Sequence, residues 1–417
     1  MTPAQLSIAF FLQTAVILVV CRLVGTAGQR WFSQPRVVGE MIAGVLLGPS
    51  LFGLVAPQIQ AFIFPPESKP VLFVIAQLGV GMYMFLVGLG FDRNAFRASG
   101  RAAAAVSIAG MAAPFLAAVF MTPWLMGMDG LFKPKVTQVE ATLFMGAAIA
   151  ITAFPMLARI IHERGLSGTS MGTLSLSAGA IDDAGAWILI ALVLASFGDG
   201  PMVAVLAIGG GIGFALVMVF IAPRLLARLG PAAEAVKGVD HNLLAISLML
   251  FMMSAWAMDA IGIHAVFGGF LLGTAMPRGM FADGLRAKLE PVVVVLLLPF
   301  FFTYSGLHTE LSLVTNPELL AVTLALLAAS IIAKGGACYV AARLGGQDHA
   351  SAMGIGALMN ARGLMELIVI NIGLQRGIIG PALFAMLVLM AIVTTLMASP
   401  LFEAVYGRAA RARGELV

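Results

Sequence analysis

Apolar runs long enough to cross a lipid bilayer follow one another along almost the whole chain. A transmembrane helix needs about 20 predominantly apolar residues, and we count thirteen such runs at roughly 5–27, 36–54, 70–91, 102–123, 139–161, 172–197, 201–222, 241–260, 262–277, 291–309, 317–343, 351–373 and 380–404. Charged residues are 11% of the chain, against roughly 25% in an average soluble domain. We therefore expect an all-α polytopic membrane protein with about 13 transmembrane helices, surrounded by lipid and without a nucleic-acid partner.

Basic residues separate into two sets when successive runs alternate in direction. The loops on one side hold 18 Lys and Arg residues, and those on the other side hold only Lys69, Lys133, Lys135 and Arg376. Cytoplasmic loops carry the excess of basic residues. The sequence thus predicts a multi-pass protein of the cell (inner) membrane, with its N-terminus outside and its C-terminus in the cytoplasm.

Two short motifs recur along the chain in the same order. "GVLLGPS" (44–50) resembles "GFLLGTA" (269–275), and "VGLGFDRN" (87–94) resembles "SGLHTELS" (305–312). Each pair is seven runs apart, and an odd offset gives the two copies opposite orientations. We expect one transporter unit over 1–417, divided into a first inverted repeat of six helices (1–200), a linker helix (201–240) and a second repeat (241–417). Inverted repeats are typical of secondary transporters with a site near the membrane midplane.

The same offset pairs two runs that are both interrupted midway. Pro155 follows Thr152 in "MGAAIAITAFPMLARII", and Asn360, Arg362 and Gly363 interrupt "MGIGALMNARGLMELIV". Discontinuous helices that cross expose half-helix ends and unpaired carbonyls, which can handle an ion. A Pro kink and a polar contact between helices would explain the same breaks without an ion.

Five charged residues lie deep inside the apolar runs: Asp182, Asp183, Lys334, Arg362 and Glu366. A charge at the bilayer centre costs roughly 2.5–3.5 kcal/mol on insertion scales. Consecutive helical residues point about 100° apart, so the two aspartates cannot face the same partner. We expect one carboxylate to pair with Lys334 and the other to face a water-filled cavity, where it holds either a proton or a monovalent cation.

That competition is the minimal chemistry of a cation/proton antiporter. Crowding of like charges and partial burial raise the pKa of a carboxyl group, whereas a nearby lysine lowers it. The same five charges also fit a buried ion network that only fixes helix packing, since breaking such a network is destabilising whatever its role.

Several stretches resemble one family of transporters: "ITAFPMLARIIHERGL" (151–166), "LSLSAGAIDDAGAWILIAL" (174–192), "IHAVFGGFLLGTAMPRG" (263–279), "LLPFFFTYSGLHTEL" (297–311) and "LMNARGLMELIVINIGLQRGII" (358–379). Together they are similar to the monovalent cation/proton antiporter superfamily, closest to the branch of plant cation/H+ exchangers and bacterial Kef-type and Nap-type antiporters. The resemblance covers nearly the whole chain. It implies thirteen helices, a core around two crossing broken helices, a separate dimerisation domain interleaved with that core, elevator-type alternating access and a homodimer.

The resemblance also implies roles for single residues. Asp183 matches the essential carrier of the cation and proton, and Asp182 matches a more variable acid. Lys334 matches a lysine that accompanies electrogenic exchange of two protons per cation in Asp-Asp relatives. Thr152 matches the unwound stretch of the first broken helix, and Arg362 matches the basic residue at the second. We expect no enzyme activity and no cofactor beyond the transported H+ and Na+ or K+. Soluble domains follow the membrane part in many relatives, and few residues follow the last run here.

Four further residues are secondary candidates for tuning the ion path: Glu366, Ser305, His264 and Glu40. The chain does not fit an intramembrane aspartyl protease, because such an enzyme needs its two acids on separate helices. A sodium-coupled symporter of an organic anion on the same crossed-helix fold remains an alternative. It predicts sodium-dependent solute uptake, whereas an antiporter predicts proton movement on addition of the cation alone.

Overall fold

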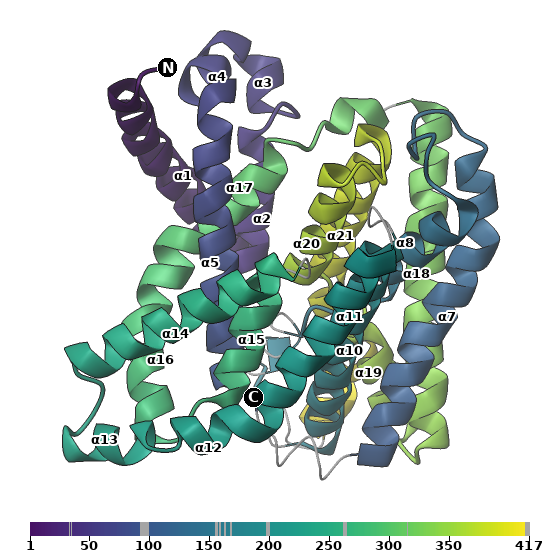
Figure 1. Cartoon of the computed structure of the whole chain (residues 1–417). Coiled ribbons are helices and arrows are strands. Elements are labelled where there is room, and N and C mark those ends of the chain that lie inside the picture. Colours follow the sequence, from purple (N-terminus) through teal and green to yellow (C-terminus); the bar gives the residue numbers. More distant parts are fainter. Residues whose placement is uncertain are drawn as a thin grey trace.

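The structure is a computed structural model of the whole chain, and its described part is helical except for one isolated bridge between Phe132 and Ile379 (Figure 1). The described residues are 1–417 without 33, 35, 92–99, 155–156, 158–159, 162–163, 167–168, 197–200, 262–264, 315 and 413–417. Within the helices, the side chains of 32, 180, 183, 184, 187, 188, 190–208, 364 and 365 also lie outside the described part.

The helices gather into two groups (Figure 1). We call the first the scaffold group, in which α5 packs against α15 and α17 and α1 packs against α2. Its members are α1 (Pro3–Phe32), α2 (Arg36–Leu47), α5 (Lys69–Leu89), α14 (His241–Ala260), α15 (Ala265–Ala275), α16 (Met280–Val292) and α17 (Leu298–Gly306). The π-helix η3 (Val293–Leu297) joins α16 to α17.

We call the second the core group, in which α7 packs against α8, α10 and α18. Its members are α7 (Gly100–Met126), α8 (Gln138–Ala150), α10 (Ser170–Ser196), α18 (Pro317–Leu344), α19 (His349–Leu358), α20 (Leu364–Gln375) and α21 (Pro381–Phe402). The π-helix η5 (Glu403–Gly407) and α22 (Arg408–Ala412) continue α21.

Shorter elements and one longer helix connect these helices, some within a group and some between the groups. They are α3 (Phe52–Val55), α4 (Pro57–Ile63), η1 (Pro66–Ser68), α11 (Pro201–Leu216), η2 (Val217–Ile221), α12 (Ala222–Leu226), α13 (Leu229–Ala235) and η4 (Leu311–Val314). In Figure 1, α11 runs between the two groups, and it contacts α10.

Among the described residues, eight helices are long and apolar enough to cross a membrane. They lie within Pro3–Trp31, Arg36–Val55, Pro57–Leu89, Gly100–Met126, Gly209–Ala235, His241–Ala260, Pro317–Leu344 and Pro381–Ala412. Three shorter apolar helices add Gln138–Ala150, Ala265–Ala275 and Glu366–Gln375. The chain is thus a multi-pass membrane protein.

Helix boundaries differ from the predicted apolar runs where a helix also includes charged residues. The run predicted at 291–309 belongs to a helix that already begins at Met280. Its first part carries Asp283, Arg286, Lys288 and Glu290 on the face opposite to buried leucines, and an amphipathic helix of this kind escapes a search for uninterrupted apolar sequence.

Glycines allow the scaffold helices to approach each other at two places that share a pattern. A β-carbon built on Gly306 of α17 would collide with the Gly44 carbonyl of α2. A β-carbon built on Gly273 of α15 would collide with the Phe85 carbonyl of α5 and lie 2.9 Å from the Gly88 α-carbon. Small residues let backbones of membrane helices come this close, so the packing of the scaffold group depends on them.

Candidate functional site

Two helix interruptions lie against each other inside the core group. Helix α8 ends at Ala150, and α19 ends at Leu358 before α20 begins at Leu364. The Ala153 backbone N–H donates to the Ala361 carbonyl across 3.0 Å, which joins the two interruptions directly. Every broken helix leaves carbonyls or N–H groups without an intrahelical partner. Side chains around this crossing satisfy four of the carbonyls, those of Ala148, Ile149, Ala150 and Met359.

Asp182 of α10 is 1% exposed, and three side chains hold its carboxylate. Ser107 Oγ of α7 donates to Oδ1 across 2.6 Å, and Thr152 Oγ1 donates to Oδ2 across 2.7 Å. The Lys334 ammonium of α18 donates to Oδ2 across 2.9 Å. Both oxygens of the carboxylate therefore have a hydrogen-bond donor, and the ammonium supplies an opposite charge beside one of them.

Lys334 is fully buried and has three acceptors. Besides Asp182, its ammonium donates to the Gly110 carbonyl of α7 across 3.3 Å and to the Ala150 carbonyl, the last of α8. An ammonium has three N–H donors. All of them have a partner here, which meets the requirement for burying such a charge.

Arg362 and Glu366 form a second buried ion pair, with Arg362 Nη1 and Glu366 Oε1 3.3 Å apart. Both side chains are fully buried. The guanidinium also donates to the Ala148 carbonyl across 3.1 Å and to the Ile149 carbonyl across 2.6 Å. Glu366 stands in the first turn of α20, where a negative charge interacts favourably with the helix dipole.

The last carbonyls of α8 are therefore occupied by two cations of the protein itself. Arg362 takes those of Ala148 and Ile149, and Lys334 takes that of Ala150. Cations near a helix C-terminus are stabilised by the partial negative charge of that end. This half-helix end, which the sequence left open as an ion-handling group, is capped by the chain's own side chains.

Thr152 connects the ion pair to the other interruption. Its hydroxyl bonds Asp182, and it also lies 3.1 Å from the Met359 carbonyl, which follows the end of α19. One side chain thus links α10 with both interruptions. A displacement of either half-helix would therefore change the hydrogen bonding of the Asp182 carboxylate.

The structure brings together five of the predicted site residues: Asp182, Thr152, Lys334, Arg362 and Glu366. The backbone of Asp183 belongs to α10, but its side chain lies outside the described residues, and so does the whole of His264.

Two secondary candidates lie in the scaffold group. Ser305 of α17 accepts a hydrogen bond from Asn371 of α20 across 3.1 Å, so it sits where the two groups meet. Glu40 is buried on α2, a helix that contacts α1 and α17.

Three residues of the crossing were not predicted from the sequence. Ser107 binds Asp182, the Gly110 carbonyl accepts from Lys334, and Thr395 Oγ1 donates to the Arg362 carbonyl across 2.8 Å. A hydroxyl in an Ala-rich run is not distinctive, because serine and threonine usually bond within their own helix. No sequence signal separated these residues from other hydroxyls and glycines in the apolar runs.

The similarity to known proteins extends over nearly the whole chain. Residues 14–405 match the family described as "Sodium/hydrogen exchanger, transmembrane". The chain is 38% identical over 394 residues to the Na(+)/H(+) antiporter NhaS4 of Synechocystis sp., which covers 94% of this chain and 95% of that protein.

Two eukaryotic relatives are longer. The chain is 35% identical over 401 residues to Cation/H(+) antiporter 17 of Arabidopsis thaliana, covering 95% of this chain and 48% of that protein. It is 31% identical over 407 residues to K(+)/H(+) antiporter 1 of Saccharomyces cerevisiae, covering 95% and 46%. The chain thus spans about half the length of these two relatives. On the match over residues 14–405, the chain belongs to the sodium/hydrogen exchanger family of membrane transporters, and it is not an enzyme.

Proposed function

We propose that this protein is a secondary antiporter that exchanges protons for a monovalent cation, Na+ or K+, across the cell membrane. The observation that carries the proposal is the fully buried Asp182–Lys334 pair, held beside two helix interruptions that contact each other. The names of the relatives, which are Na(+)/H(+), K(+)/H(+) and cation/H(+) antiporters, support antiport. They give no support to the symporter alternative.

Asp183 is the proposed carrier, and Asp182 is its fixed neighbour. Both oxygens of Asp182 already accept hydrogen bonds, from Ser107, Thr152 and Lys334. Giving that carboxylate to a cation would require those bonds to break. Consecutive positions of a helix lie about 100° apart around its axis, so positions 182 and 183 of α10 do not share one face of the helix.

The buried charges at the crossing support this division of work. Lys334 balances Asp182, and Arg362 balances Glu366. Asp183 adds one further acid to this set. A carboxylate in a partly dehydrated site binds one proton or one monovalent cation at a time, and this exclusion couples the two flows in opposite directions.

We propose that exchange is electrogenic. Over one cycle, Lys334, Asp182 and Asp183 together exchange more proton charge than the single positive charge of the cation carried. The buried ammonium of Lys334 depends on Asp182 for compensation, because an unpaired buried charge is strongly unfavourable. In this proposal two protons move for each cation, one with Asp183 and one with the Asp182–Lys334 pair, so one net charge crosses the membrane in each cycle.

The transport step that we propose is an elevator movement of the core group against the scaffold group. Asp182, Lys334, Arg362 and Glu366 all belong to the core group, so they can move together. Ser305 and Asn371 hydrogen bond across the boundary between the groups, and this bond has to break when one group slides.

The proposed architecture has thirteen transmembrane helices in two inverted repeats, with the N-terminus outside, the C-terminus in the cytoplasm and two copies in a homodimer. The glycine contacts support the repeats. Gly48 of the first motif meets Gly306, and Gly273 at the matching place of the second motif meets Gly88. Gly306 and Gly88 correspond in the other pair of motifs.

The test is proton movement in proteoliposomes that hold a preset pH gradient. Na+, K+ and Li+ are added in turn, with and without a voltage clamp by K+ and valinomycin for the ions that permit it. We expect one or more cations to dissipate the gradient at a rate that depends on the clamped voltage. A gradient that no monovalent cation dissipates would overturn antiport, and a rate independent of voltage would overturn electrogenic exchange alone.

A further inference from the structure

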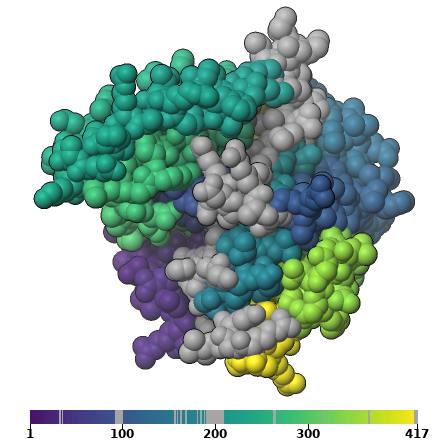
Figure 2. All heavy atoms as spheres, turned by 90° about the horizontal axis from the view of Figure 1, so that it is seen from below, coloured from purple at the N-terminus to yellow at the C-terminus, as the bar shows by residue number. Residues whose placement is uncertain are grey.

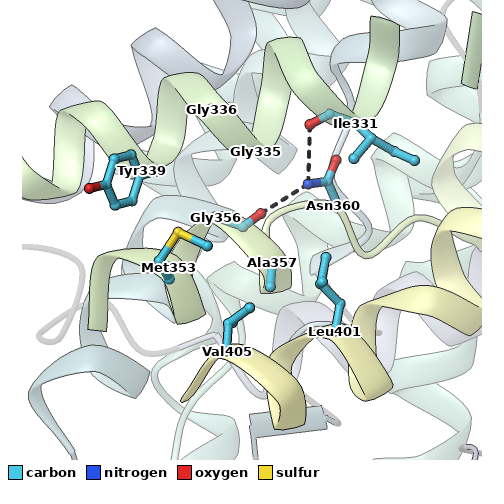
Figure 3. A pocket seen from close by; sticks show the side chains of 10 residues that line it. All are labelled: Ile331, Gly335, Gly336, Tyr339, Met353, Gly356, Ala357, Asn360, Leu401 and Val405. Carbon is cyan, nitrogen blue, oxygen red and sulfur yellow. Dashed lines mark hydrogen bonds between the residues drawn. The ribbon is translucent and has the colours of Figure 1, made fainter. Parts of the chain in front are cut away.

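A groove of about 230 Å³ lies in the core group between α18, α19 and the α21–η5 segment (Figure 3). Helix α18 contributes Ile331, Gly335 and Tyr339 to one wall, and the α21–η5 segment contributes Leu401 and Val405 to another. Helix α19 supplies the remaining wall through Met353, Gly356 and Ala357. Apart from Tyr339 and the side chain of Asn360, these residues offer hydrocarbon and glycine to an occupant.

Two walls of the groove are parts of the apolar helices Pro317–Leu344 and Pro381–Ala412, which are long enough to span a membrane. Gly336, which also lines the groove, is exposed on α18. The medium at the mouth is therefore the hydrocarbon of the bilayer, so the occupant that reaches the groove most readily is a lipid acyl chain.

Two of the three walls continue to an exposed arginine about one turn beyond the groove. On α18, positions 331, 335, 339 and 343 follow the four-residue spacing that places side chains on one helix face. The fourth of them is Arg343. On the opposite wall, Arg408 follows Val405 by three residues. Seen from below, the light-green end of α18 lies beside the yellow C-terminal segment (Figure 2).

Both arginines have donors to offer to an anion. Arg343 donates to the Gln347 carbonyl across 2.7 Å, and a guanidinium has five N–H donors. Two acids lie near this end of the groove. Glu403 is engaged by Arg164 and Arg411, and Asp348 accepts hydrogen bonds from the first turn of α19. Arg343 and Arg408 are exposed, so this end is complementary to a phosphate rather than to a neutral headgroup.

We infer that this groove binds one anionic phospholipid, with an acyl chain between α18, α19 and η5 and its phosphate at Arg343 and Arg408. The proposal combines two complementary parts, an apolar groove inside the membrane and a basic end at its surface. Each arginine near an anionic lipid surface strengthens binding roughly fivefold. The site is separate from the ion pairs, and its occupancy does not depend on what the protein transports.

The test is native mass spectrometry of the intact detergent-purified protein, titrated with phosphatidylglycerol or with phosphatidylcholine of the same acyl chains. We expect wild type to retain one phosphatidylglycerol at concentrations where phosphatidylcholine is lost. Gly336 lines the groove, and a β-carbon built on it meets no atom within 4 Å, so Gly336→Leu places a bulky side chain at the mouth without displacing the backbone. This variant should lose the bound lipid.

Two controls use the same substitutions elsewhere. Gly213 of α11 is also exposed, and a β-carbon built on it meets nothing within 4 Å, so Gly213→Leu should bind as wild type does. Arg343→Gln and Arg408→Gln should each weaken binding roughly fivefold. The control is Arg228→Gln, at the exposed residue just before α13, which should leave binding unchanged.

Three results would overturn the proposal. Equal retention of phosphatidylcholine would show a groove that selects hydrocarbon without a headgroup. Unchanged retention in Gly336→Leu would locate the lipid elsewhere. A dimer present in wild type and lost in Gly336→Leu, with no lipid bound, would assign the groove to a second copy of the chain.

Discussion

Lys334 donates a hydrogen bond to Asp182 across 2.9 Å in a place where neither side chain is exposed to solvent. Removing one member of a buried ion pair costs about 3–5 kcal/mol, because the other is left as an uncompensated charge. The pair is thus a stability element of the core group as well as a part of the proposed ion path. Single and double substitutions separate these two contributions.

Asp182→Asn and Lys334→Met should each lower the melting temperature of the purified protein, with a loss of about 3–5 kcal/mol. The double variant should be more stable than either single variant, because no unpaired charge remains. Thermal unfolding in detergent measures all three. Additive losses would show that the two side chains do not depend on each other.

The lysine also sets the expected voltage dependence. We expect exchange by Lys334→Ala, where it survives, to lose its response to a clamped voltage while its apparent affinity for the cation changes less. Proteoliposome flux at several voltages measures the first quantity, and a cation titration measures the second. A melting temperature and a voltage response that both match wild type would contradict the assignment.

Asp183→Asn should abolish exchange and leave the melting temperature close to that of wild type, because the described hydrogen bonds of Asp182 come from Ser107, Thr152 and Lys334. Proton flux and thermal unfolding are measured on the same preparation. The matched control is Asp182→Asn, for which we expect the opposite emphasis, a marked loss of stability. Retained exchange by Asp183→Asn would remove this residue from the carrier position.

Thr152→Val should reduce both stability and exchange, because the valine keeps the shape of the side chain and removes the hydroxyl that reaches Asp182 and Met359. A buried acceptor that loses its donor costs about 1–3 kcal/mol. Thr152→Ser should recover most of the loss. Thr323→Val is the control, since the Thr323 hydroxyl bonds only the Leu319 carbonyl of its own helix among the described contacts.

Gly306→Ala should destabilise the scaffold group, because its β-carbon would collide with the Gly44 backbone of α2. Overpacking of this kind typically costs about 1–3 kcal/mol. Gly336→Ala adds the same methyl group to an open position of α18 and should raise helix stability slightly. Equal melting temperatures for the two variants would contradict the close approach of α2 and α17.

The charged residues of the crossing were predictable because charge inside an apolar run is costly and needs a partner. This reasoning selected Asp182, Lys334, Arg362 and Glu366, and the structure joins them in two ion pairs. The breaks near Thr152 and Asn360 were predictable too, since polar residues and Pro155 interrupt the runs there, although Pro155 itself lies outside the described residues.

Partners that depend on the register between helices were not predictable. Lys334 and Arg362 both reach the end of α8, and only the packing of α18 and the second interruption against α8 decides which carbonyl each one meets. The same holds for Ser107, whose contact with Asp182 spans 75 positions of the chain. Placing a hydroxyl group in an apolar run costs too little free energy to mark its residue as part of a site.

Consecutive residues of α18 face different environments. Lys334 points to Asp182, while Gly335 and Gly336 line the groove. Rolling this helix about its axis by one residue, about 100°, would bring the ammonium toward hydrocarbon, where it costs several kcal/mol. In the proposed transport cycle α18 therefore has to keep its rotation about its own axis and move together with α7, α8 and α10, which hold its lysine.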